Sequence, residues 1–506
     1  MPHLAVVPAP RSLRSAPSAP FALASAVVKG ETDAAATLLS LVAARTGLTL
    51  ETAEDAASGP SITLAIAAGA APESYRLIAD ASSVVVTGAD AAGLFYGVQT
   101  LAQLIVRDGG SWVVPAVEIE DAPRFEYRGV MLDVARHFHP VATVKAYIDR
   151  AASLKFNALH LHLTDDQGWR LELSSRPRLT EVASGTSVGG DPGGFYTQAD
   201  YREIVEYAAS RHLIVVPEID VPGHTHAVGL AYPELAEAPV LSDHIAQVAE
   251  TYGGGMPTAG VPYDGMAVGF SSLRIHEEAT YDFLADVFGE VARLTPGPYL
   301  HIGGDEALGT DPADFAVFME RASAIVADLG KTPVTWHEAG SAAGLHPDTI
   351  GQYWGFVTPT DGMDDKTRAF VAHGAQVILS PSDAIYLDMK PDAGSRLGLT
   401  WANGPTSVER SYSWEPAAII DGVSEADILG VEAPLWTETV RDLDDIDALA
   451  FPRIAAAAEA AWSPAVGASD LRTWESFRER VGTLGPLWTV LGIRFPASPE
   501  IPWRTE

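Results

Sequence analysis

The sequence predicts an α/β fold in which a TIM (β/α)8 barrel follows a smaller N-terminal α/β domain. From residue 127 onward, short apolar segments alternate with helical segments, and eight of the apolar segments qualify as strands. Strands that are separated by helices form a parallel sheet, and eight such strands close into a barrel. Acidic and aromatic residues follow several of these strands, as expected at the catalytic face of a barrel.

The smaller domain is expected to span residues 1–122, with strands at 61–67 and 83–88 and helices at 31–46 and 91–106. It carries no cluster of carboxylates or histidines, so we interpret it as a structural support for the barrel. The catalytic barrel is expected over residues 123–506, and residues 470–491 are expected to form one closing amphipathic helix.

The barrel strands are predicted from apolar runs that end in polar or aromatic residues. Their expected ranges are 127–135, 158–165, 214–220, 299–306, 332–338, 349–355, 376–388 and 428–438. Helix signals lie between them: Pro140 precedes one helix, Thr197 and Asp200 have the spacing of a capping box, and Asp311-Pro312 begins another helix. Residues 240–274 and 394–414 interrupt this alternation, and we expect them to form walls of a substrate cleft.

Composition excludes several classes of function. The 506-residue chain has a formal charge of −33, which disfavours binding to nucleic acid or to an anionic membrane surface. Without cysteine there is no disulfide, thiolate zinc site or cysteine nucleophile. Prolines near the N-terminus replace the apolar core of a signal peptide, so a cytoplasmic location is expected, with a secreted form whose signal has been removed as the alternative. No apolar run is long enough to predict a transmembrane helix.

The segment Tyr299-Leu-His-Ile-Gly-Gly-Asp-Glu306 gives the strongest functional signal. A solvated turn or a helix cap would explain many Asp-Glu pairs, but this pair follows an apparent barrel strand and is therefore interpreted as catalytic. Adjacent side chains on an extended strand point apart, so Asp305 and Glu306 are not expected to flank a scissile bond as nucleophile and acid.

Aromatic residues at the ends of other strands point to a sugar substrate. Trp336, Trp354 and Trp436 follow three different strands, and Arg136 follows the first. Indole rings stack on the apolar face of a pyranose, whereas carboxylates and guanidinium groups bind its hydroxyls. The sequence therefore predicts a carbohydrate site at the carboxyl ends of the strands.

Five segments resemble glycoside hydrolase family 20, the β-N-acetylhexosaminidases, over about residues 120–465. They are Arg128-Gly-Val-Met-Leu-Asp-Val-Ala-Arg-His137, Leu159-His-Leu-His-Leu-Thr-Asp-Asp-Gln-Gly-Trp-Arg170, Pro217-Glu-Ile-Asp-Val-Pro-Gly-His224, His301-Ile-Gly-Gly-Asp-Glu306 and Leu435-Trp-Thr-Glu438. The N-terminal segment also resembles the non-catalytic domain that precedes the barrel in this family.

The resemblance implies an exo-acting, retaining enzyme that removes terminal β-linked GlcNAc or GalNAc, in which the substrate's acetamide oxygen attacks C1 and forms an oxazolinium ion. It implies the following roles: Glu306 as general acid/base, Asp305 at the acetamido N–H, Tyr386 at the acetamido carbonyl, Trp336, Trp354 and Trp436 around the methyl group, Arg136 and Glu438 at O3 and O4, Asp388 at O6, Asp165 and His224 as a pair behind Glu306, and Trp401 in the cleft wall. The implied partners are oligosaccharides or glycoconjugates that end in N-acetylhexosamine, and no cofactor or metal is implied.

Two other classes of protein remain as alternatives. The pairs His160-Leu-His162 and His224-Thr-His226 could each place two imidazoles on one face of a strand, as in metal-dependent amidohydrolases. That reading would leave the tryptophans and Arg136 unexplained, and His160 and His162 are better read as packing or hydrogen-bonding residues. A non-catalytic sugar-binding barrel would keep the aromatic residues but has no need of both acids. The choice between GlcNAc and GalNAc, the linkage and the oligomeric state are left open.

Overall fold

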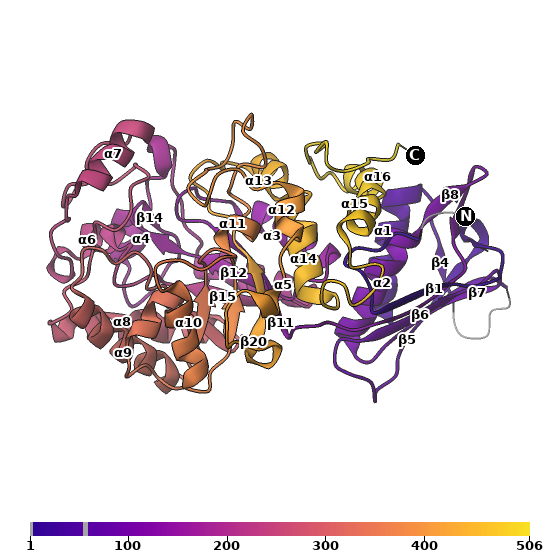
Figure 1. The fold of residues 1–506 in the computed structure, drawn as a ribbon, viewed down its shortest axis with the longest axis horizontal. Coiled ribbons are helices and arrows are strands. Elements are labelled where there is room, and N and C mark those ends of the chain that lie inside the picture. Colours follow the sequence, from indigo (N-terminus) through magenta and orange to yellow (C-terminus); the bar gives the residue numbers. More distant parts are fainter. Residues whose placement is uncertain (1–3, 54–58, 506) are drawn as a thin grey trace.

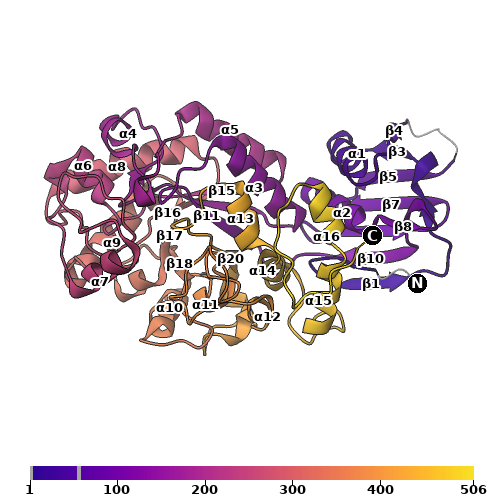
Figure 2. The same cartoon turned by 90° about the horizontal axis from the view of Figure 1, so that it is seen from above.

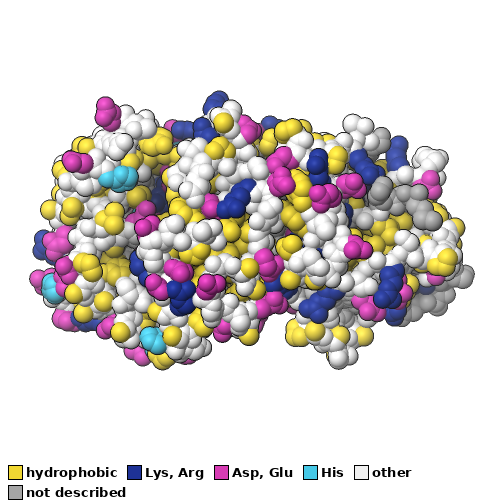
Figure 3. Space-filling view, in the orientation of Figure 1, with side chains coloured by type: hydrophobic (Ala, Val, Ile, Leu, Met, Phe, Trp, Pro, Cys, Tyr) yellow, Lys and Arg dark blue, Asp and Glu magenta, His cyan; other side chains and the backbone are white. Residues whose placement is uncertain are grey.

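The structure, a computed structural model, describes residues 4–53 and 59–505. A layered N-terminal part and a barrel lie end to end along the long axis of the molecule, as Figure 1 shows. Acidic side chains are spread over the face seen in Figure 3, with basic side chains between them. Among the described residues, no helix combines the length and the apolar character needed to cross a bilayer.

The N-terminal part is built on a seven-stranded mixed sheet. Its strand order is β1 (Ser12–Ser15), β10 (Val117–Asp121), β6 (Tyr75–Ala79), β7 (Ser83–Gly88), β5 (Ser61–Ile66), β3 (Val27–Gly30) and β4 (Glu51–Thr52). Helices α1 (Thr32–Thr46) and α2 (Ala91–Leu104) pack against each other and against the sheet. The predicted strands β5 and β7 and both predicted helices are therefore confirmed. Helix α2 ends two residues early because Val106 begins β8 (Val106–Asp108), which pairs with β9 (Ser111–Val114) and, through it, β2 (Phe21–Ala22).

Eight parallel strands close the barrel, and all eight predicted strands are confirmed. They are β11 (Tyr127–Asp133), β12 (Ala158–His162), β15 (Ile214–Glu218), β16 (Tyr299–His301), β17 (Thr332–Trp336), β18 (Ile350–Tyr353), β19 (Val377–Leu379) and β20 (Ile428–Ala433). The last strand pairs with the first, so the sheet has no free edge. A small hairpin, β13 (Thr164–Asp165) and β14 (Gly168–Trp169), follows β12.

Helices surround these strands, as Figure 2 shows from above. The main ones are α3 (Val141–Ser153), α5 (Gln198–Ser210), α8 (Glu278–Leu294), α9 (Pro312–Asp328), α10 (Met363–Ala372), α13 (Leu443–Ala450) and α14 (Arg453–Trp462). The predicted capping box is present at the start of α5, where Thr197 and Asp200 each accept the other's backbone N–H. Asp311 caps α9 by accepting from the Ala313 N–H. Short helices α4 (Arg178–Ala183) and α6 (His226–Ala231) pack against each other and against the hairpin β13–β14.

Two strands are much shorter than predicted. Strand β16 stops at His301 because Gly303 and Gly304 take positive φ angles of 62° and 100°, which turn the chain out of the sheet. A Cβ atom at Gly303 would lie 1.7 Å from Asp220 Oδ1, so only glycine fits there. Strand β19 has three residues, and Pro381 precedes helix α11 (Ser382–Ile385). Tyr386 therefore follows a helix rather than ending a strand.

The predicted closing helix is two short helices, α15 (Trp474–Gly482) and α16 (Gly485–Val490). The prediction of one helix was wrong because the chain turns at residues 483–484 and Pro486 begins a new helix. These helices lie between the barrel and the N-terminal part in Figure 1, where α16 contacts α1.

Buried ion pairs fix the two parts to each other. Glu459 on α14 accepts from the side chains of Arg472 and Arg480 and from the Ala9 backbone N–H. Arg128 on β11 pairs with Glu73 at 2.9 Å, and Lys155 pairs with Asp121 at 3.0 Å. Because removing one partner of a buried pair leaves an uncompensated charge, these contacts hold the parts in one arrangement.

Candidate active site

A cavity of about 340 Å³ at the carboxyl ends of the barrel strands collects most of the predicted site residues. Its lining includes Arg136, Asp305, Glu306, Trp354, Tyr386, Trp401, Trp436 and Glu438. The other four predicted residues, Asp165, His224, Trp336 and Asp388, are buried and contact this lining from behind.

A larger cavity of about 440 Å³ lies at the junction of the two parts, between α1, α2 and α3. Among the described residues, Asp149 is its one lining carboxylate. It therefore lacks the paired acids that glycoside hydrolysis uses, and we place the chemistry in the cavity at the barrel rim.

Asp305 and Glu306 turn toward the same imidazole. His224 Nε2 lies 3.7 Å from Asp305 Oδ2 and 3.6 Å from Glu306 Oε2. The prediction that these neighbouring side chains point apart was wrong, because the segment has left the strand and Glu306 adopts a left-handed φ of 44°. The Asp305 side chain is 10% exposed and that of Glu306 is 35% exposed, so Glu306 reaches further toward the open part of the cavity.

A line of buried charges lies behind the two acids. Asp165 contacts His224 Nδ1 at 3.2 Å through one oxygen and Arg136 at 2.9 Å through the other. Burial raises the pKa of Asp165, but Arg136 and His224 outweigh it and lower the pKa below its usual value. Burial lowers the pKa of His224, but the carboxylates of Asp165, Asp220 and Asp305 outweigh it and raise that pKa well above 6.5. His224 is therefore a cation that faces both acids.

Asp305 ionises less readily than an ordinary aspartate. Burial raises the pKa of Asp305 to about 6, with a lowering contribution from His224 and a raising contribution from Glu306. Its Oδ1 atom is buried and has no hydrogen-bond partner among residues 4–53 and 59–505. This atom is available to accept a hydrogen bond from a ligand.

Aromatic rings gather at one side of the cavity, where Trp354, Tyr386 and Trp436 line it and Trp336 packs behind Trp436. The Trp336 and Trp436 ring centroids are 6.1 Å apart, and Tyr386 lies 6.4 Å from Trp436. Burial raises the pKa of Tyr386 well above 10, so its hydroxyl stays protonated and can donate. Trp354 donates its indole N–H to Glu338 at 3.1 Å, and burial and Asp305 raise the pKa of Glu338 to about 8.

Polar side chains that could bind the hydroxyls of a sugar ring lie beside these aromatic residues. The guanidinium of Arg136 sits 4.7 Å over the Trp436 ring. Burial raises the pKa of Glu438 to about 7 although Arg136 lowers it, and burial and Glu438 raise that of Asp388 well above its usual value. Within the described part of the chain, Glu438 Oε2 and both oxygens of Asp388 are buried without a hydrogen-bond partner.

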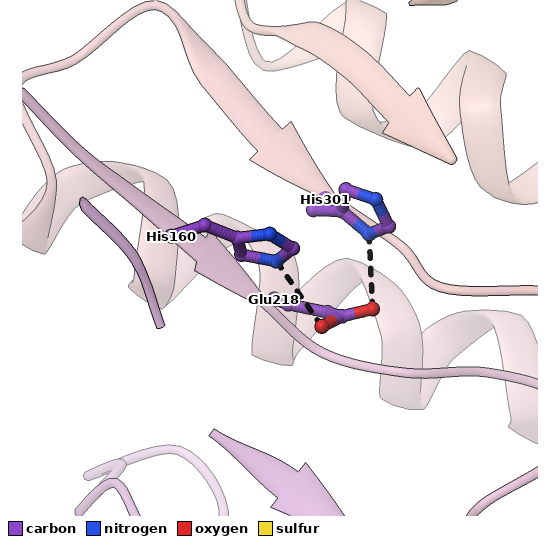
Figure 4. Close-up of side chains that lie close together, drawn as sticks. All are labelled: His160, Glu218 and His301. Carbon is purple, nitrogen blue, oxygen red and sulfur yellow. Dashed lines mark ion pairs between the residues drawn. The ribbon is translucent and has the colours of Figure 1, made fainter. Parts of the chain in front are cut away.

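Below the cavity, Glu218 on β15 is the centre of a buried cluster. Figure 4 shows Glu218 between His160 and His301, whose ring nitrogens each lie 3.1 Å from one of its oxygens. Glu218 also accepts from the Trp336 indole N–H at 2.9 Å and is hydrogen-bonded to His162 Nδ1. His162 contacts Asp165 through its other nitrogen at 2.8 Å. The cluster thus connects the Trp336 ring to the charges behind Glu306.

The His-x-His pairs differ in their geometry. Both ring nitrogens of His162 are hydrogen-bonded to carboxylates, and His160 is hydrogen-bonded to Glu432 at 2.9 Å. Both histidines are therefore hydrogen-bonding residues of the barrel core. His224 and His226 do not share a strand face, because His224 has a φ of 55° and His226 begins α6, where its ring contacts the Val261 carbonyl.

The sequence pattern left some site residues without a role. Glu218 ends β15 and Glu338 lies in the turn after β17, but only the fold shows that they are hydrogen-bonded to Trp336 and Trp354. His244, Val248, Tyr252, Met266 and Val268 also line the cavity. They lie in the long insertion at 240–274, where a cleft wall was expected but no individual residue could be singled out.

Comparisons with known proteins agree with this geometry. A sequence model described as the catalytic domain of glycosyl hydrolase family 20 matches residues 125–465, and one described as domain 2 of that family matches residues 3–122. A curated β-N-acetylhexosaminidase from Cellulomonas fimi is 41% identical and aligns over 99% of this chain and 98% of its own length.

Solved structures are similar over almost the whole chain. A glycoside hydrolase family 20 β-N-acetylglucosaminidase is 67% identical, with a TM-score of 0.93, over 99% of this chain and 100% of its own. A mutant β-hexosaminidase from Streptomyces plicatus, in complex with its product GlcNAc, is 43% identical with a TM-score of 0.89 and covers 99% of this chain and 98% of its own.

Proposed function

Because this chain belongs to glycosyl hydrolase family 20, we propose that it is an exo-acting, retaining β-N-acetylhexosaminidase that removes terminal β-linked N-acetylhexosamine. Its substrates are oligosaccharides or glycoconjugates that end in this sugar. The 67% identical β-N-acetylglucosaminidase supports GlcNAc as the preferred sugar.

The observation that carries the proposal is a set of buried oxygens that lack partners. Asp305 Oδ1, Glu438 Oε2 and both Asp388 oxygens are such atoms, and aromatic rings lie beside them. Leaving a buried acceptor unpaired costs about 1–3 kcal/mol, so native proteins keep few of them. The acetamido N–H and the hydroxyls of an N-acetylhexosamine supply the missing donors, while its apolar parts contact the rings.

The first step is proposed to proceed by attack of the substrate's own acetamide. Asp305 accepts the acetamido N–H, and the Tyr386 hydroxyl donates to the carbonyl oxygen. That oxygen forms a bond to C1 as the bond from C1 to the leaving oxygen breaks, and Glu306 gives its proton to the leaving oxygen. Well-oriented internal nucleophiles reach effective molarities of about 10⁵–10⁸ M, and the enclosing Trp336, Trp354 and Trp436 supply that orientation.

The second step is proposed to be hydrolysis of the oxazolinium ion, with Glu306 acting as a base. Glu306, now a carboxylate, takes a proton from water as the water oxygen attacks C1 and the oxazolinium ring opens. Two displacements at C1 restore the β configuration. Asp305 stabilises the positive charge on the ring nitrogen and carbon in both steps. The His224 cation, which contacts Asp165, stabilises the negative charge that appears on Glu306 after the first step.

A substrate panel tests the proposal. The expected result is hydrolysis of 4-nitrophenyl β-GlcNAc with retained configuration at C1 and kcat/KM for 4-nitrophenyl β-glucoside lower by at least about 10³-fold, since the glucoside lacks the internal nucleophile. A similar kcat/KM for both glycosides would exclude the mechanism, and no turnover of either would favour a non-catalytic sugar-binding barrel. Activity that a chelator abolishes and zinc restores would favour the metal-dependent alternative.

A further inference from the structure

The cavity of about 440 Å³ at the junction of the two parts has no role in the proposed mechanism. Its volume falls within the range of small-molecule sites, which is about 300–1,000 Å³. Three helices line it: α1 and α2 from the N-terminal part, and α3 from the barrel. Leu491 and Ile493, which follow α16, complete the lining. A ligand in this cavity would therefore contact both parts of the molecule.

Small side chains keep this cavity open. Helix α3 contributes Ala146, Ala152 and Ser153 to its lining, and α1 contributes Ala36 and Ser40. Residues four positions apart, such as Ala36 and Ser40, lie on one face of a helix. Larger side chains at these positions would fill the space, as they do in most protein interiors. The sequence therefore leaves room for a ligand between two parts that buried ion pairs hold in one arrangement.

One polar side chain of the cavity is buried and unpaired. Gln99 on α2 is 7% exposed, and its amide has no hydrogen-bond partner within residues 4–53 and 59–505. Gln103, one helical turn further on, shows the usual arrangement: it accepts from the Val7 N–H and donates to the Val7 carbonyl, both at 2.8 Å. An unpaired buried amide lowers stability. Gln99 therefore has both its donor and its acceptor available to a ligand.

The charged groups around the cavity are already paired. Arg150 donates to both oxygens of Asp447, one of them at 2.9 Å, and Arg211 pairs with Asp149 at 2.8 Å. Each arginine that the structure places in the lining thus has its own carboxylate. An ion that entered the cavity would lose water without gaining a free partner of opposite charge. The lining therefore favours a neutral ligand.

The remaining lining groups match a sugar ring. The hydroxyls of Thr37 and Ser153 donate to carbonyls of their own helices at 3.0 and 2.7 Å and can still accept from a ligand. Apolar side chains, among them Leu41, Phe95 and Leu491, line other parts of the cavity. A pyranose has hydroxyls at its edge and C–H groups on its faces, so it can use both kinds of surface.

We propose that this cavity is a second sugar site, separate from the active site, which binds one N-acetylhexosamine. The Gln99 N–H donates to the acetamido carbonyl, and the Gln99 carbonyl oxygen accepts from a ring hydroxyl. An amide carbonyl is a better acceptor than a hydroxyl, so the buried N–H favours an acetamido sugar over a plain one. The lining has no residue in common with that of the rim cavity. This inference rests on the lining itself and not on the proposed function.

The test measures GlcNAc binding while the rim cavity is filled. The wild-type protein is saturated with a thiazoline mimic of the oxazolinium ion, and GlcNAc is titrated by ligand-observed NMR. One saturable site with a Kd of about 0.1–10 mM is expected, since a monosaccharide makes few contacts. The melting temperature should rise with GlcNAc concentration, because the sugar binds only the folded protein. Glucose, which lacks the acetamido group, and glucuronate, an anion, should bind at least about fivefold more weakly.

Variants assign this binding to the junction. Gln99→Leu keeps the size of the side chain, removes two hydrogen bonds to the sugar and should raise the Kd about 5- to 100-fold. Ser40→Phe fills the cavity from an exposed position on α1 and should abolish binding. Ala43→Phe is the matched control, because Ala43 is exposed on the same helix but does not line the cavity, and the Kd should equal that of the wild type.

All three variants should cleave 4-nitrophenyl β-GlcNAc with kcat/KM within twofold of the wild type, because none of the substituted residues lines the rim cavity. Unchanged hydrolysis also shows that the variants are folded. A protein that neither binds the thiazoline mimic nor cleaves the aryl glycoside contradicts the proposed function. The same variants then decide about the junction site in a titration without the mimic.

Saturable binding that Gln99→Leu weakens and Ala43→Phe leaves unchanged supports the second site. The proposal is overturned if the blocked wild type shows no saturable binding, or if Gln99→Leu and Ser40→Phe bind GlcNAc as the wild type does. Glucose or glucuronate that binds as tightly as GlcNAc would overturn the recognition of a neutral acetamido sugar.

Discussion

Trp336 and Glu218 are joined by a buried hydrogen bond, in which the indole N–H donates to Glu218 Oε1 at 2.9 Å. The same carboxylate is hydrogen-bonded to His162, which contacts Asp165 behind His224. One side chain therefore positions both the Trp336 ring, which is proposed to contact the acetamido methyl group, and the charges that face Glu306.

Glu218→Gln is expected to lower both activity and stability. The substitution keeps the shape but removes the charge that His162, His301 and His160 stabilise, and these histidines lower the pKa of Glu218 although burial raises it. A depressed folded-state pKa gives stability that is present above about pH 4 and lost as pH falls through the folded value. At pH 7 the loss should be about 3–5 kcal/mol in urea unfolding. Glu206→Gln, at an exposed position, is the control. If Glu218→Gln leaves both the stability and the affinity for a thiazoline inhibitor unchanged, Glu218 does not have this positioning role.

Glu306→Gln and Asp305→Asn should differ in their dependence on the leaving group. Glu306→Gln removes general acid catalysis, worth roughly 10²–10⁴-fold, so the loss should be severe for disaccharides and milder for activated aryl glycosides. Asp305→Asn should reduce both similarly, because in the proposed mechanism Asp305 acts on the acetamido group whichever group leaves. Rates across a series of aryl leaving groups measure this contrast. If the rate of Asp305→Asn depends steeply on the leaving group and the rate of Glu306→Gln does not, the two roles are reversed.

The pH profile should show an acid limb from Asp305. Its pKa of about 6 means that kcat/KM falls as pH drops below about 6, because protonated Asp305 no longer stabilises the positive acetamido group. The same raised pKa makes the folded protein hold this proton more tightly than the unfolded chain, so this group's contribution to stability falls as pH rises from about 4 to 6. Asp305→Asn should therefore lack the limb and exceed the wild type in stability above pH 6, by about 1–3 kcal/mol. An unchanged acid limb in this variant would assign the titration to another group.

Arg136→Ala should weaken binding and slow turnover together. Its guanidinium pairs with Asp165 at 2.9 Å and lies over Trp436. Removal therefore takes away one of the two cations that contact Asp165, and in the proposed complex it also removes a donor to the sugar. The expected loss in kcat/KM is on the order of 2–4 kcal/mol. Steady-state kinetics with 4-nitrophenyl β-GlcNAc measure it, with Arg202→Ala on the exposed face of α5 as control. Activity within twofold of wild type would show that the sugar lies elsewhere.

Asp388 should contribute only when the substrate has an O6 hydroxyl. Asp388→Ala is expected to lower kcat/KM for 4-nitrophenyl β-GlcNAc about 10- to 100-fold, the cost of leaving buried hydrogen-bonding groups unpaired. The same variant should change kcat/KM little for the 6-deoxy analogue. Asp388→Asn should lie closer to the wild type, because burial and Glu438 raise the pKa of Asp388 and favour the neutral carboxyl that asparagine resembles. Equal losses on both substrates would remove Asp388 from O6.

The sequence predicted the elements whose signals are local. Apolar runs located β11 and the seven other barrel strands, and Thr197 with Asp200 located the start of α5. The turn after His301 was missed because it depends on two glycines with positive φ, which an apolar pattern does not report. The apolar pattern therefore predicted an extended strand at Asp305 and Glu306, whereas in the fold both side chains approach His224.

Contacts between strands explain the rest of the difference. Glu218 meets His160 and His301 because β12, β15 and β16 are neighbours, and no spacing within one segment shows this. The cavity lining contributed by residues 240–274 depends on how this long insertion folds over the rim, which residue patterns alone do not define. The domain boundary at residue 122, the cytoplasmic location and the roles of individual site residues stay predictions.

Because β11 pairs with β20, the barrel can close only after most of the chain has been synthesised. The His137 N–H, just after β11, donates to Thr437 Oγ1, which lies 300 residues further along the chain. At about 5–20 residues per second, a ribosome takes roughly 15–60 s to make that interval. During this time the first strand has an unpaired edge, of the kind that recruits chaperones or other nascent chains. All strands of the N-terminal sheet have been synthesised by Asp121, so this sheet can form before the last barrel strand is made.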